Sequence, residues 1–509
     1  MTSSQQDATS ALLSGYQWSG PQQDGRLVIT YSFAGAQSVY SDLSAGFRET
    51  STAFSAADQQ VTRELLAAIE AVCNVQFQEV ADGAAGHGDV RYSYSQRPND
   101  LGLAGYAFFP SNLESGGDVW IGAEQAGLQW EGYRPFLILH ETLHALGLQH
   151  PHDGEAISDT VMSDAPFAGS AHGVLSLYPT EPMLLDVQAL QQLYGAAQSN
   201  LGDTRYDLGD SSFASLRNLW DAGGNDTLDA SGCLAGVTID LRSGTHSSVG
   251  TSVSGFAYEA SGTVQGSLGN TLSIAPGCVL ENAIGSNFND VLHGNEVANT
   301  LSGLDGDDVF IIGSGYATVI GGAGDDSVQL DGVLANYAVS NESGYMAVRD
   351  LSDGRAVARL SGVEHLVFAD ASVDLAPMPA PTPVSALDPG AETPQSTAIT
   401  VARLYQAAFG RLPDADGMAF HSASLMQSHD LGAVADSFLA SPEFNVRYGL
   451  PGDQAYVSQL YANVLGRAPD AQGMAYYLDL LADGSADFGV LLVGFAQSPE
   501  NRTLFEQQA

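Results

Sequence analysis

The stretch that decides the fold is His140-Glu141-Thr142-Leu143-His144-Ala145-Leu146-Gly147-Leu148-Gln149-His150-Pro151. It begins inside a helix that the apolar spacing predicts over residues 135–146. Residues four apart share one face of a helix, so the imidazoles of His140 and His144 can bind one metal ion. Gly147 can end the helix and reverse the chain, which would bring His150 back as a third nitrogen ligand. The stretch predicts a zinc site with an open fourth position.

Glu141, next to the first histidine, can take a proton from a water molecule at that fourth position and carry it to a leaving amine. The predicted chemistry is metal-assisted hydrolysis of a peptide bond. A helix with incidental surface histidines is the alternative, and the full set of residues at the required spacing argues against it. The remaining histidines are scattered along the chain, and we expect them to be solvated.

The motif resembles that of the metzincin zinc peptidases, whose pattern continues to a methionine turn below the metal. Asp159-Thr160-Val161-Met162-Ser163 matches that turn. The closer resemblance is to the serralysin family of secreted bacterial proteases. It rests on the zinc motif and on Leu12-Leu-Ser-Gly-Tyr-Gln-Trp18, Gly105-Tyr-Ala-Phe-Phe-Pro110, Gly116-Gly-Asp-Val-Trp-Ile121 and Asp186-Val-Gln-Ala-Leu-Gln-Gln-Leu-Tyr-Gly195.

This resemblance covers residues 1 to about 375 and implies an α+β catalytic domain. It also implies a strand that borders the cleft and hydrogen-bonds an extended peptide as an added strand. The residues expected in that substrate strand are Gly117, Asp118, Val119 and Trp120.

One position departs from the family pattern. The family usually has a tyrosine two residues after the turn methionine, as a further zinc ligand that stabilises the oxyanion, whereas this chain has Asp164. An ionised carboxylate cannot donate a hydrogen bond. Three outcomes stay open: reduced turnover, an oxyanion donor from elsewhere such as His172, or a shifted loop in which Tyr178 substitutes.

An apolar residue recurs every nine residues from Gly285 onward, at Leu292, Leu301, Phe310, Val319 and Val328. Two residues before each lies Asp290, Asn299, Asp308, Ala317 or Asp326. This pattern is typical of the parallel β-roll with RTX repeats, in which turn carbonyls and a carboxylate bind Ca²⁺ and a short strand buries its apolar residue. Several usual glycine positions hold other residues, among them Leu304, so some calcium sites are expected to be vacant.

The serralysin resemblance implies two further calcium elements before these rows, a glycine-aspartate turn and weaker ligand segments. All the calcium ligands predicted in the chain are Asn200, Gly202, Thr204, Asp221, Gly223, Gly224, Asp226, Glu281, Asp290, Asn299, Gly306, Asp308 and Asp326.

Changes in composition divide the chain into four parts. We predict a multidomain protein with an α+β metzincin catalytic domain at 1–195, a calcium-binding β-roll at 196–375, a Pro-rich linker at 376–398 and an all-α domain at 399–509. The last part contains two copies of a repeat, in which Leu404-Tyr405 aligns with Leu460-Tyr461, and Phe438 with Phe495. It resembles helical repeats of unknown function at the ends of secreted bacterial proteins.

The chain has 17 Lys+Arg against 59 Asp+Glu, a formal net charge of −42. Such a polyanion would be repelled by nucleic acid and by anionic lipid, and no apolar run is long enough for a membrane span. Three cysteines cannot form a disulfide framework. The N-terminal residues lack the pattern of a secretory signal peptide, so we expect export through a type I secretion apparatus, as in the serralysin family.

The sequence predicts a secreted, extracellular zinc metalloendopeptidase that uses Zn²⁺ for catalysis and Ca²⁺ for folding. We expect protein or peptide substrates and a monomer. The alternative is a calcium-folded surface or matrix protein with a weak or inactive peptidase domain, which Asp164 and the terminal repeats favour and the intact histidine motif disfavours.

Overall fold

The computed structural model describes most of the chain up to residue 375 and parts of the C-terminal region. The described residues are 3–375, except 36–37, 41–50, 128–131, 152–153, 211–212, 214, 251 and 343–344, together with 394–411, 413, 415–428, 431–439, 441, 444, 453–465, 474, 477–478, 481 and 488–497. The predicted linker at 376–398 lies outside the described residues up to 393, and its last residues belong to a helix. Within the described part, no helix is long and apolar enough to cross a membrane.

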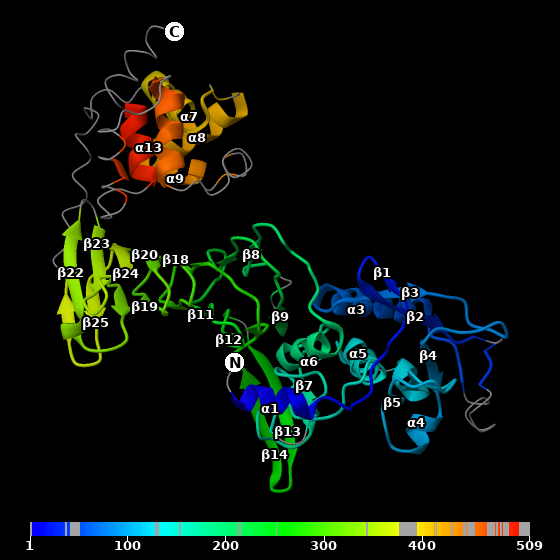
Figure 1. Ribbon diagram of the computed structural model, residues 1–509. Helices are drawn as coiled ribbons and strands as arrows, with labels where there is room; N and C mark the ends of the chain where they lie inside the picture. The colour runs from blue at the N-terminus through cyan, green and yellow to red at the C-terminus, as the bar shows by residue number, and fades with distance from the viewer. Residues whose placement is uncertain are drawn as a thin grey trace. The chain divides into compact units, whose positions relative to one another are not determined.

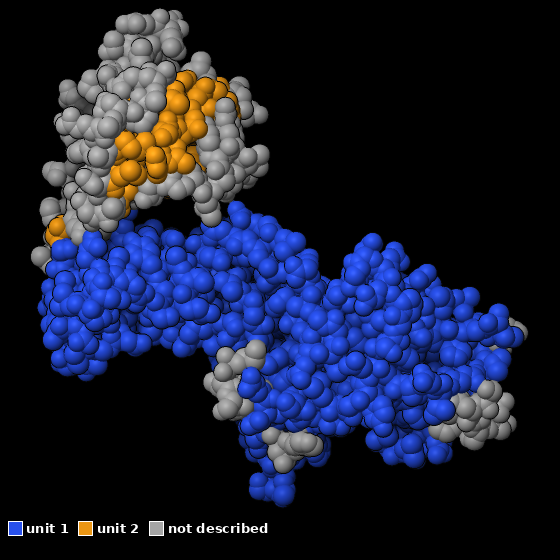
Figure 2. Space-filling model, in the orientation of Figure 1, with its two compact units in different colours: residues 1–340, 345–377 blue, residues 341–344, 378–509 orange. Residues whose placement is uncertain are grey.

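The described chain divides into two compact units, coloured separately in Figure 2. The first contains residues 1–340 and 345–377, and the second contains residues 341–344 and 378–509. The first unit has two large hydrophobic cores, one built mainly from residues before 195 and one from residues after 205. The regions expected to be the catalytic domain and the β-roll therefore belong to one compact unit with separate cores.

A mixed sheet forms the scaffold of the N-terminal half (Figure 1). The strand order is β1-β2-β4-β6-β5, with β3 also paired to β2. Strands β2, β3, β4 and β6 pair in parallel, whereas β5 runs antiparallel to β6 and forms the edge. The strands are β1 (Gln22–Gln23), β2 (Arg26–Phe33), β3 (Val75–Glu79), β4 (Val90–Ser95), β5 (Gly105–Ala107) and β6 (Asp118–Gly122).

Helices complete this half. They are α1 (Ser3–Ala11), α3 (Ala56–Val72), α4 (Arg97–Asp100), the 3₁₀ helix η1 (Ala123–Gly127), α5 (Tyr133–Ala145) and α6 (Leu184–Tyr194). Helix α3 begins where the side chain of Ser55 accepts a hydrogen bond from the amide of Asp58, as an N-cap does. Its apolar face, with Leu65, Leu66 and Ile69, is buried in the core that it shares with α5. The helix predicted over residues 135–146 is therefore present as α5, with its bounds shifted by one or two residues.

The second half of the first unit contains two facing sheets of short strands, most of them parallel. One has the order β22-β23-β24-β20-β18-β16-β10-β8 and the other β11-β17-β19-β21-β25-β26. Their strands are β8 (Arg205–Asp207), β10 (Thr227–Asp229), β11 (Thr238–Asp240), β16 (Asn282–Ile284), β17 (Val291–His293), β18 (Asn299–Asp305), β19 (Val309–Ile311), β20 (Ala317–Ala323), β21 (Ser327–Gln329), β22 (Tyr337–Glu342), β23 (Tyr345–Asp350), β24 (Ala356–Ser361), β25 (His365–Val367) and β26 (Ser372–Asp374). A 3₁₀ turn, η3 (Leu334–Asn336), precedes β22.

The nine-residue pattern explains this arrangement. Leu292 pairs with Phe310 and Phe310 with Val328 in one sheet, while Leu301 pairs with Val319 in the other. All five side chains are fully buried. Successive rows thus alternate between the two sheets and fill the space between them, as a parallel β-roll requires.

Two smaller sheets connect the halves. One joins β12 (His246–Ser247), β15 (Leu272–Ile274) and β9 (Arg217–Leu219). The other is a hairpin of β13 (Val253–Glu259) and β14 (Gly262–Leu268), with β7 (Gly173–Leu175) added antiparallel to β13. The hairpin projects from the body of the unit in Figure 1. Through β7 it connects the β-roll half to the chain that follows the methionine turn.

From residue 394 onward, the described elements of the second unit are all helices or helical turns. It contains α7 (Pro394–Phe409), α8 (Ala415–Ser428), α9 (Leu431–Leu439), α11 (Asp453–Leu460), the π-helical turn η4 (Tyr461–Leu465) and α13 (Phe488–Gln497). The aligned repeat positions Leu404 and Leu460 are both buried in its core, as are Phe438 and Phe495. The loop of the second copy, at 466–473, lies outside the described residues.

Candidate metal centre

Helix α5 carries the first two histidines and the glutamate of the motif into the protein interior. His140 and Glu141 are buried, and His144 is half-buried. The helix ends before Gly147, whose φ of 106° lies in the left-handed region. A Cβ at this position would overlap the carbonyl oxygen of Tyr16, so the tight reversal requires glycine.

This reversal brings His150 to the two helical histidines. The Nε2 atom of His150 lies 3.0 Å from that of His140 and 3.1 Å from that of His144. The nitrogen atoms of the three rings lie within 4.8 Å of one another. A cluster of three imidazole nitrogens suits Zn²⁺, which is commonly bound by three histidines with one open position.

Hydrogen bonds to the backbone orient two of these rings. The Nδ1 of His140 lies 2.8 Å from the carbonyl oxygen of Val161, and the Nδ1 of His144 lies 2.8 Å from that of Leu148. Each Nδ1–H therefore donates to a carbonyl, and the free lone pair stays on Nε2. Burial lowers the pKa of His140 to about 4 and that of His144 to about 3. Both rings are neutral near pH 7, which is the form that binds a metal.

The turn that contains Met162 lies directly behind His140. Its residue Val161 accepts the hydrogen bond from the His140 ring, and Met162 is buried. The carboxylate of Asp186, at the start of α6, holds this turn by accepting hydrogen bonds from the Thr160 hydroxyl (2.5 Å) and the Val161 amide (2.7 Å). Asp186 therefore fixes the carbonyl that orients a metal ligand, a role that the sequence analysis did not assign.

Glu141 is buried with one carboxylate oxygen, Oε2, that has no hydrogen-bond partner among the described residues. Burial raises its pKa to about 8, and the charge of Asp164 contributes to the increase. The other oxygen lies against edge strand β5, where a Cβ at Gly105 would lie 2.8 Å from Oε1. A buried carboxylate with an unpartnered oxygen beside three histidines suggests a group that acts on a bound molecule.

A cavity of about 590 Å³ opens in front of these residues. One wall is β5 and another is the first half of α5, with Tyr133, Phe136 and Leu137. The chain after the methionine turn also contributes to it. The three histidines, Glu141 and the edge strand β5 therefore share one cavity.

The prediction of the substrate strand is wrong. Asp118, Val119 and Trp120 lie in β6, and Gly117 directly precedes it. Strand β6 is paired to β4 on one side and to β5 on the other. The side chain of Asp118 is fully buried in an ion pair with Arg91, at 2.9 Å. An interior strand has no free hydrogen-bonding groups for a peptide, so β5, with Gly105, Tyr106 and Ala107, is the edge that can accept one.

Asp164 occupies the position of the usual tyrosine, and His172 and Tyr178 were considered as its substitutes. All three residues line the cavity. Asp164 and His172 are exposed at its wall, whereas Tyr178 is buried. The hydroxyl oxygen of Tyr178 accepts a hydrogen bond from the Leu175 amide at 3.2 Å, and its ring packs 4.8 Å from that of Phe136. The three outcomes stay open.

The predicted first calcium cluster is brought together from three segments. Thr204 donates its amide to Asp226 Oδ1 (2.8 Å), and Asp226 donates its own to Glu281 Oε2 (2.8 Å). A Cβ at Gly224 would lie 2.6 Å from Asp226 Oδ1 and 2.7 Å from the carbonyl oxygen of Gly202. Burial raises the pKa of Asp226 to about 6, and Asp221 and Glu281 add to the effect.

Other members of this cluster have protein partners of their own. The carboxylate of Asp221 accepts hydrogen bonds from the Gly223 amide (3.0 Å) and the Tyr206 hydroxyl (2.7 Å). The side-chain nitrogen of Asn200 points toward Tyr206 and the Trp220 carbonyl. Oxygen atoms crowded around glycines are a suitable cation site, whereas Asn200 presents its nitrogen.

The acidic column, which we define as Asp290, Asp308, Asp326 and Glu364, runs along one edge of the β-roll. The amide of Asp290 donates to Asp308 Oδ1 (2.8 Å), that of Asp308 to Asp326 Oδ1 (2.9 Å), and that of Asp326 to Glu364 Oε2 (2.9 Å). The second oxygens of Asp308 and Asp326 are buried without a hydrogen-bond partner among the described residues. The sequence analysis missed Glu364, which lies outside the nine-residue rows.

Burial and the neighbouring carboxylates raise the pKa of Asp308 to about 7 and that of Asp326 to about 6. Turn carbonyls face the same space, because a Cβ at Gly285 would lie 2.8 Å from the oxygen of Gly303. At Gly306, a Cβ would lie 2.7 Å from the oxygen of Phe288. Stacked carboxylates with unpaired oxygens and nearby carbonyls have the donor set that Ca²⁺ prefers.

The opposite edge differs. Asn299 accepts the Asn295 amide at Oδ1 (2.8 Å), and its nitrogen donates to Asn295 Oδ1 (2.9 Å) and to the Glu281 carbonyl (3.1 Å). We call Asn295 and Asn299 the amide corner. Asn299 was predicted as a calcium ligand. Its NH₂ group instead donates hydrogen bonds to the two nearby oxygens, which are thereby satisfied without a cation.

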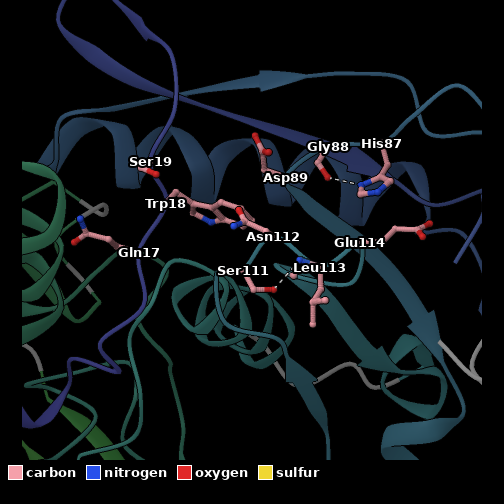
Figure 3. A pocket seen from close by; sticks show the side chains of 11 residues that line it. Gln17, Trp18, Ser19, His87, Gly88, Asp89, Ser111, Asn112, Leu113 and Glu114 are labelled. Carbon is pink, nitrogen blue, oxygen red and sulfur yellow. Dashed lines mark hydrogen bonds between the residues drawn. The ribbon is translucent and has the colours of Figure 1, made fainter. Parts of the chain in front are cut away.

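A second cavity, of about 510 Å³, shares no lining residue with the cavity of the metal centre, and Figure 3 shows it from close by. It is lined by Trp18, His87, Asp89 and Glu114, among others. Most of its polar groups have protein partners: the Trp18 indole donates to the Ala145 carbonyl (2.8 Å), and Asp89 accepts from the amide and hydroxyl of Thr30 (2.8 and 2.7 Å). None of the predicted site residues lines it.

Comparison with known proteins agrees with this architecture. Residues 185–370 match the family described as "Peptidase M10 serralysin C terminal", and residues 435–505 match a "Domain of unknown function (DUF4214)". Serralysin G of Dickeya chrysanthemi is 33% identical over 324 residues, which cover 56% of this chain and 63% of that protein. Serralysin of Proteus mirabilis is 30% identical over 328 residues, with the same two shares. Metalloprotease AprA of Pseudomonas entomophila is 29% identical over 335 residues, or 58% of this chain and 64% of that protein. The chain thus matches a little less than two thirds of the length of these relatives.

Proposed function

We propose that this chain, which is related by sequence to the serralysin-type metalloproteases, is a secreted zinc-dependent endopeptidase stabilised by calcium. The observation that carries the proposal is the convergence of three imidazole Nε2 atoms beside the buried carboxylate of Glu141, whose Oε2 has no described hydrogen-bond partner, in one cavity. We assign residues 1–195 to catalysis, residues 196–375 to the calcium-binding roll, residues 376–393 to a linker and, because α7 begins at Pro394, residues 394–509 to a helical repeat domain.

In this proposal His140, His144 and His150 hold Zn²⁺ through Nε2. A zinc ion held there would supply Lewis-acid activation of water. The backbone of β5 aligns an extended peptide by adding it as a strand across the cavity mouth. Glu141 takes a proton at Oε2 and delivers it to the leaving amine, because this oxygen is buried at the cavity and has no other described partner.

Calcium is proposed to bind the acidic column and the cluster formed by Asp221, Asp226 and Glu281. In both places buried carboxylates repel one another and retain unpaired oxygens, which a divalent cation would bridge. The low calcium concentration of the cytosol would keep the roll unfolded during export through a type I secretion apparatus. Extracellular calcium would then fold the roll. The partners proposed are protein or peptide substrates, and the protein is proposed to act as a monomer.

One observation favours the second candidate, a surface or matrix protein with a weak peptidase domain. Asp164 stands on the cavity wall where the family pattern has an oxyanion donor, and its charge raises the pKa of Glu141. A carboxylate at this position would disfavour the oxyanion of the transition state.

The test is cleavage of an unfolded protein substrate by the purified chain in calcium with zinc. Glu141→Gln should abolish cleavage while zinc stays bound, and Glu124→Gln, a change at an exposed glutamate outside the cavity, should leave the rate unchanged. If the native chain cleaves nothing across a range of substrates and pH values, the peptidase assignment fails and the second candidate remains.

A further inference from the structure

The exposed face of the β13–β14 hairpin carries large apolar side chains without a described partner surface. In β13, Ser254, Phe256 and Tyr258 alternate with the buried residues Val253, Gly255 and Ala257. Phe256 is 42% exposed and Tyr258 is 44% exposed. Their cross-strand partners on the same face are Gln265 and Thr263, which are also exposed. This face is therefore aromatic and uncharged on a chain with a strong negative net charge.

The other face of the hairpin is anchored to the wall of the metal cavity. A Cβ at Gly255 or at Gly266 would approach the ring of Phe167 to 3.3 or 2.8 Å, so the two glycines make room for that ring. The Glu259 carboxylate accepts the Ala171 amide at 2.8 Å. The Ser254 carbonyl accepts the Ser176 amide at 2.7 Å. These contacts fix the hairpin to the chain segment that follows Asp164.

The aromatic face meets the cavity wall at His172. The His172 carbonyl accepts the Tyr258 amide at 2.9 Å, and the two rings lie 5.7 Å apart. His172 and Gly173 line the metal cavity, and Gly173 pairs with Ala257 of the hairpin. A polypeptide that leaves the cavity past His172 would therefore meet Tyr258 and then Phe256.

We propose that Phe256 and Tyr258, together with His172, form an extension of the substrate cleft that binds an apolar side chain of a polypeptide several residues from the scissile bond. We call these three residues the hairpin face. This inference rests on the proposed function for the identity of the occupant. Partly exposed aromatic rings on a rigid hairpin can bury apolar surface at little entropic cost, which favours an unfolded polypeptide over a short peptide.

The test uses internally quenched tetrapeptides and decapeptides of one host sequence, with Phe or Asp placed toward either end of the decapeptide. In the double variant Phe256→Ser/Tyr258→Ser, the ratio of kcat/KM for the Phe-bearing decapeptide to that for the tetrapeptide should fall about tenfold, which is about 1.4 kcal/mol. The matched control is Val264→Ser, an exposed apolar residue on the opposite face of the same hairpin, which should leave the ratio unchanged.

An equal loss for both peptide lengths, an unchanged ratio, or an equal effect of Val264→Ser would overturn the proposal. A gain of function guards against misfolding: Thr263→Arg, on the hairpin face side beside Tyr258, should increase kcat/KM for the Asp-bearing decapeptide. No gain there would also count against a peptide at this face.

Binding separates this inference from the proposed function. Fluorescence polarisation should show that the zinc-loaded Glu141→Gln chain binds the labelled Phe-bearing decapeptide, and that the double variant binds it about tenfold more weakly. If the native chain cleaves nothing while binding depends on the hairpin face, the peptidase assignment alone is refuted. Cleavage with binding independent of Phe256 and Tyr258 would refute the hairpin face alone.

Discussion

The histidines of the metal centre and the carboxylates of the acidic column differ in what holds them together before a cation binds. The rings of His140 and His144 are neutral and are oriented by hydrogen bonds to Val161 and Leu148, so their lone pairs converge without electrostatic cost. The carboxylates of Asp308 and Asp326 are buried side by side with unpaired oxygens. The first arrangement is ready to receive its ion, whereas the second opposes folding until an ion arrives.

Removal of calcium should therefore change the structure, whereas removal of zinc should not. This is the largest difference that we expect. Chelation of calcium should unfold the β-roll, with loss of its β signal in circular dichroism and of its cooperative melting transition. Selective chelation of zinc should abolish cleavage and leave the far-ultraviolet spectrum unchanged. A roll that keeps its spectrum and Tm in excess calcium chelator would contradict the role of the acidic column.

Acid should partly replace calcium. The pKa of Asp308 is raised in the folded chain from 3.8 to about 7, so the folded state binds its proton more tightly than the unfolded state between these values. In calcium-free solution the stability of the roll should therefore increase as the pH falls from about 8 to about 5, the reverse of a carboxylate in a salt bridge. The folded fraction of the calcium-free chain at several pH values, measured by circular dichroism, reports this trend. A stability that falls over the same interval would show that another group dominates.

Exchanging charge and amide between the two edges of the roll sharpens the comparison. Asp308→Asn should stabilise the calcium-free roll by about 1–3 kcal/mol, since it removes a buried charge, and should lower the number of calcium ions bound. Asn299→Asp should destabilise the calcium-free roll by a similar amount, because it places a carboxylate against Asn295 Oδ1 and the Glu281 carbonyl. The β signal of each calcium-free variant in circular dichroism and calorimetric calcium titrations check both, and changes of the same sign in both variants would contradict the distinction between the edges.

The support behind the histidines should give the smallest effect. Asp186→Asn weakens the hydrogen bonds that hold the Val161 carbonyl against His140, so zinc affinity should fall about 10–100-fold with the fold retained. Competition with a zinc-binding dye measures the affinity. Asp159→Asn serves as a control in the same turn because its side chain is not hydrogen-bonded to the Val161 backbone. An unchanged affinity in Asp186→Asn would show that the turn is held by other contacts.

The sequence carried the parts of this account that depend on local spacing. His140 and His144 lie one helical turn apart, and Gly147 permits the reversal that returns His150, so the cluster could be predicted from a single stretch. The nine-residue rows likewise fix which residues of the roll point inward.

Features that depend on distant pairings could not be predicted in this way. The spatial order of the strands decides that β5 rather than β6 forms the sheet edge. This order depends on pairing with other strands and cannot be read from the residues of β5 or β6 alone. Asp186 and Glu364 gain their roles from contacts with residues 25 and 38 positions away. The hairpin face depends on the pairing of Ala257 with Gly173, across the boundary that composition suggested at residue 195.

The central claim is that the three histidines and Glu141 form a catalytic zinc site. Its most direct test is a zinc titration of the zinc-free chain in saturating calcium. Zinc occupancy, cleavage of an unfolded protein and the circular dichroism spectrum are followed together. We predict that cleavage rises in proportion to occupancy, reaches its maximum at one zinc per chain and leaves the spectrum unchanged. A fully occupied site without cleavage, or cleavage that does not depend on zinc, would contradict the account.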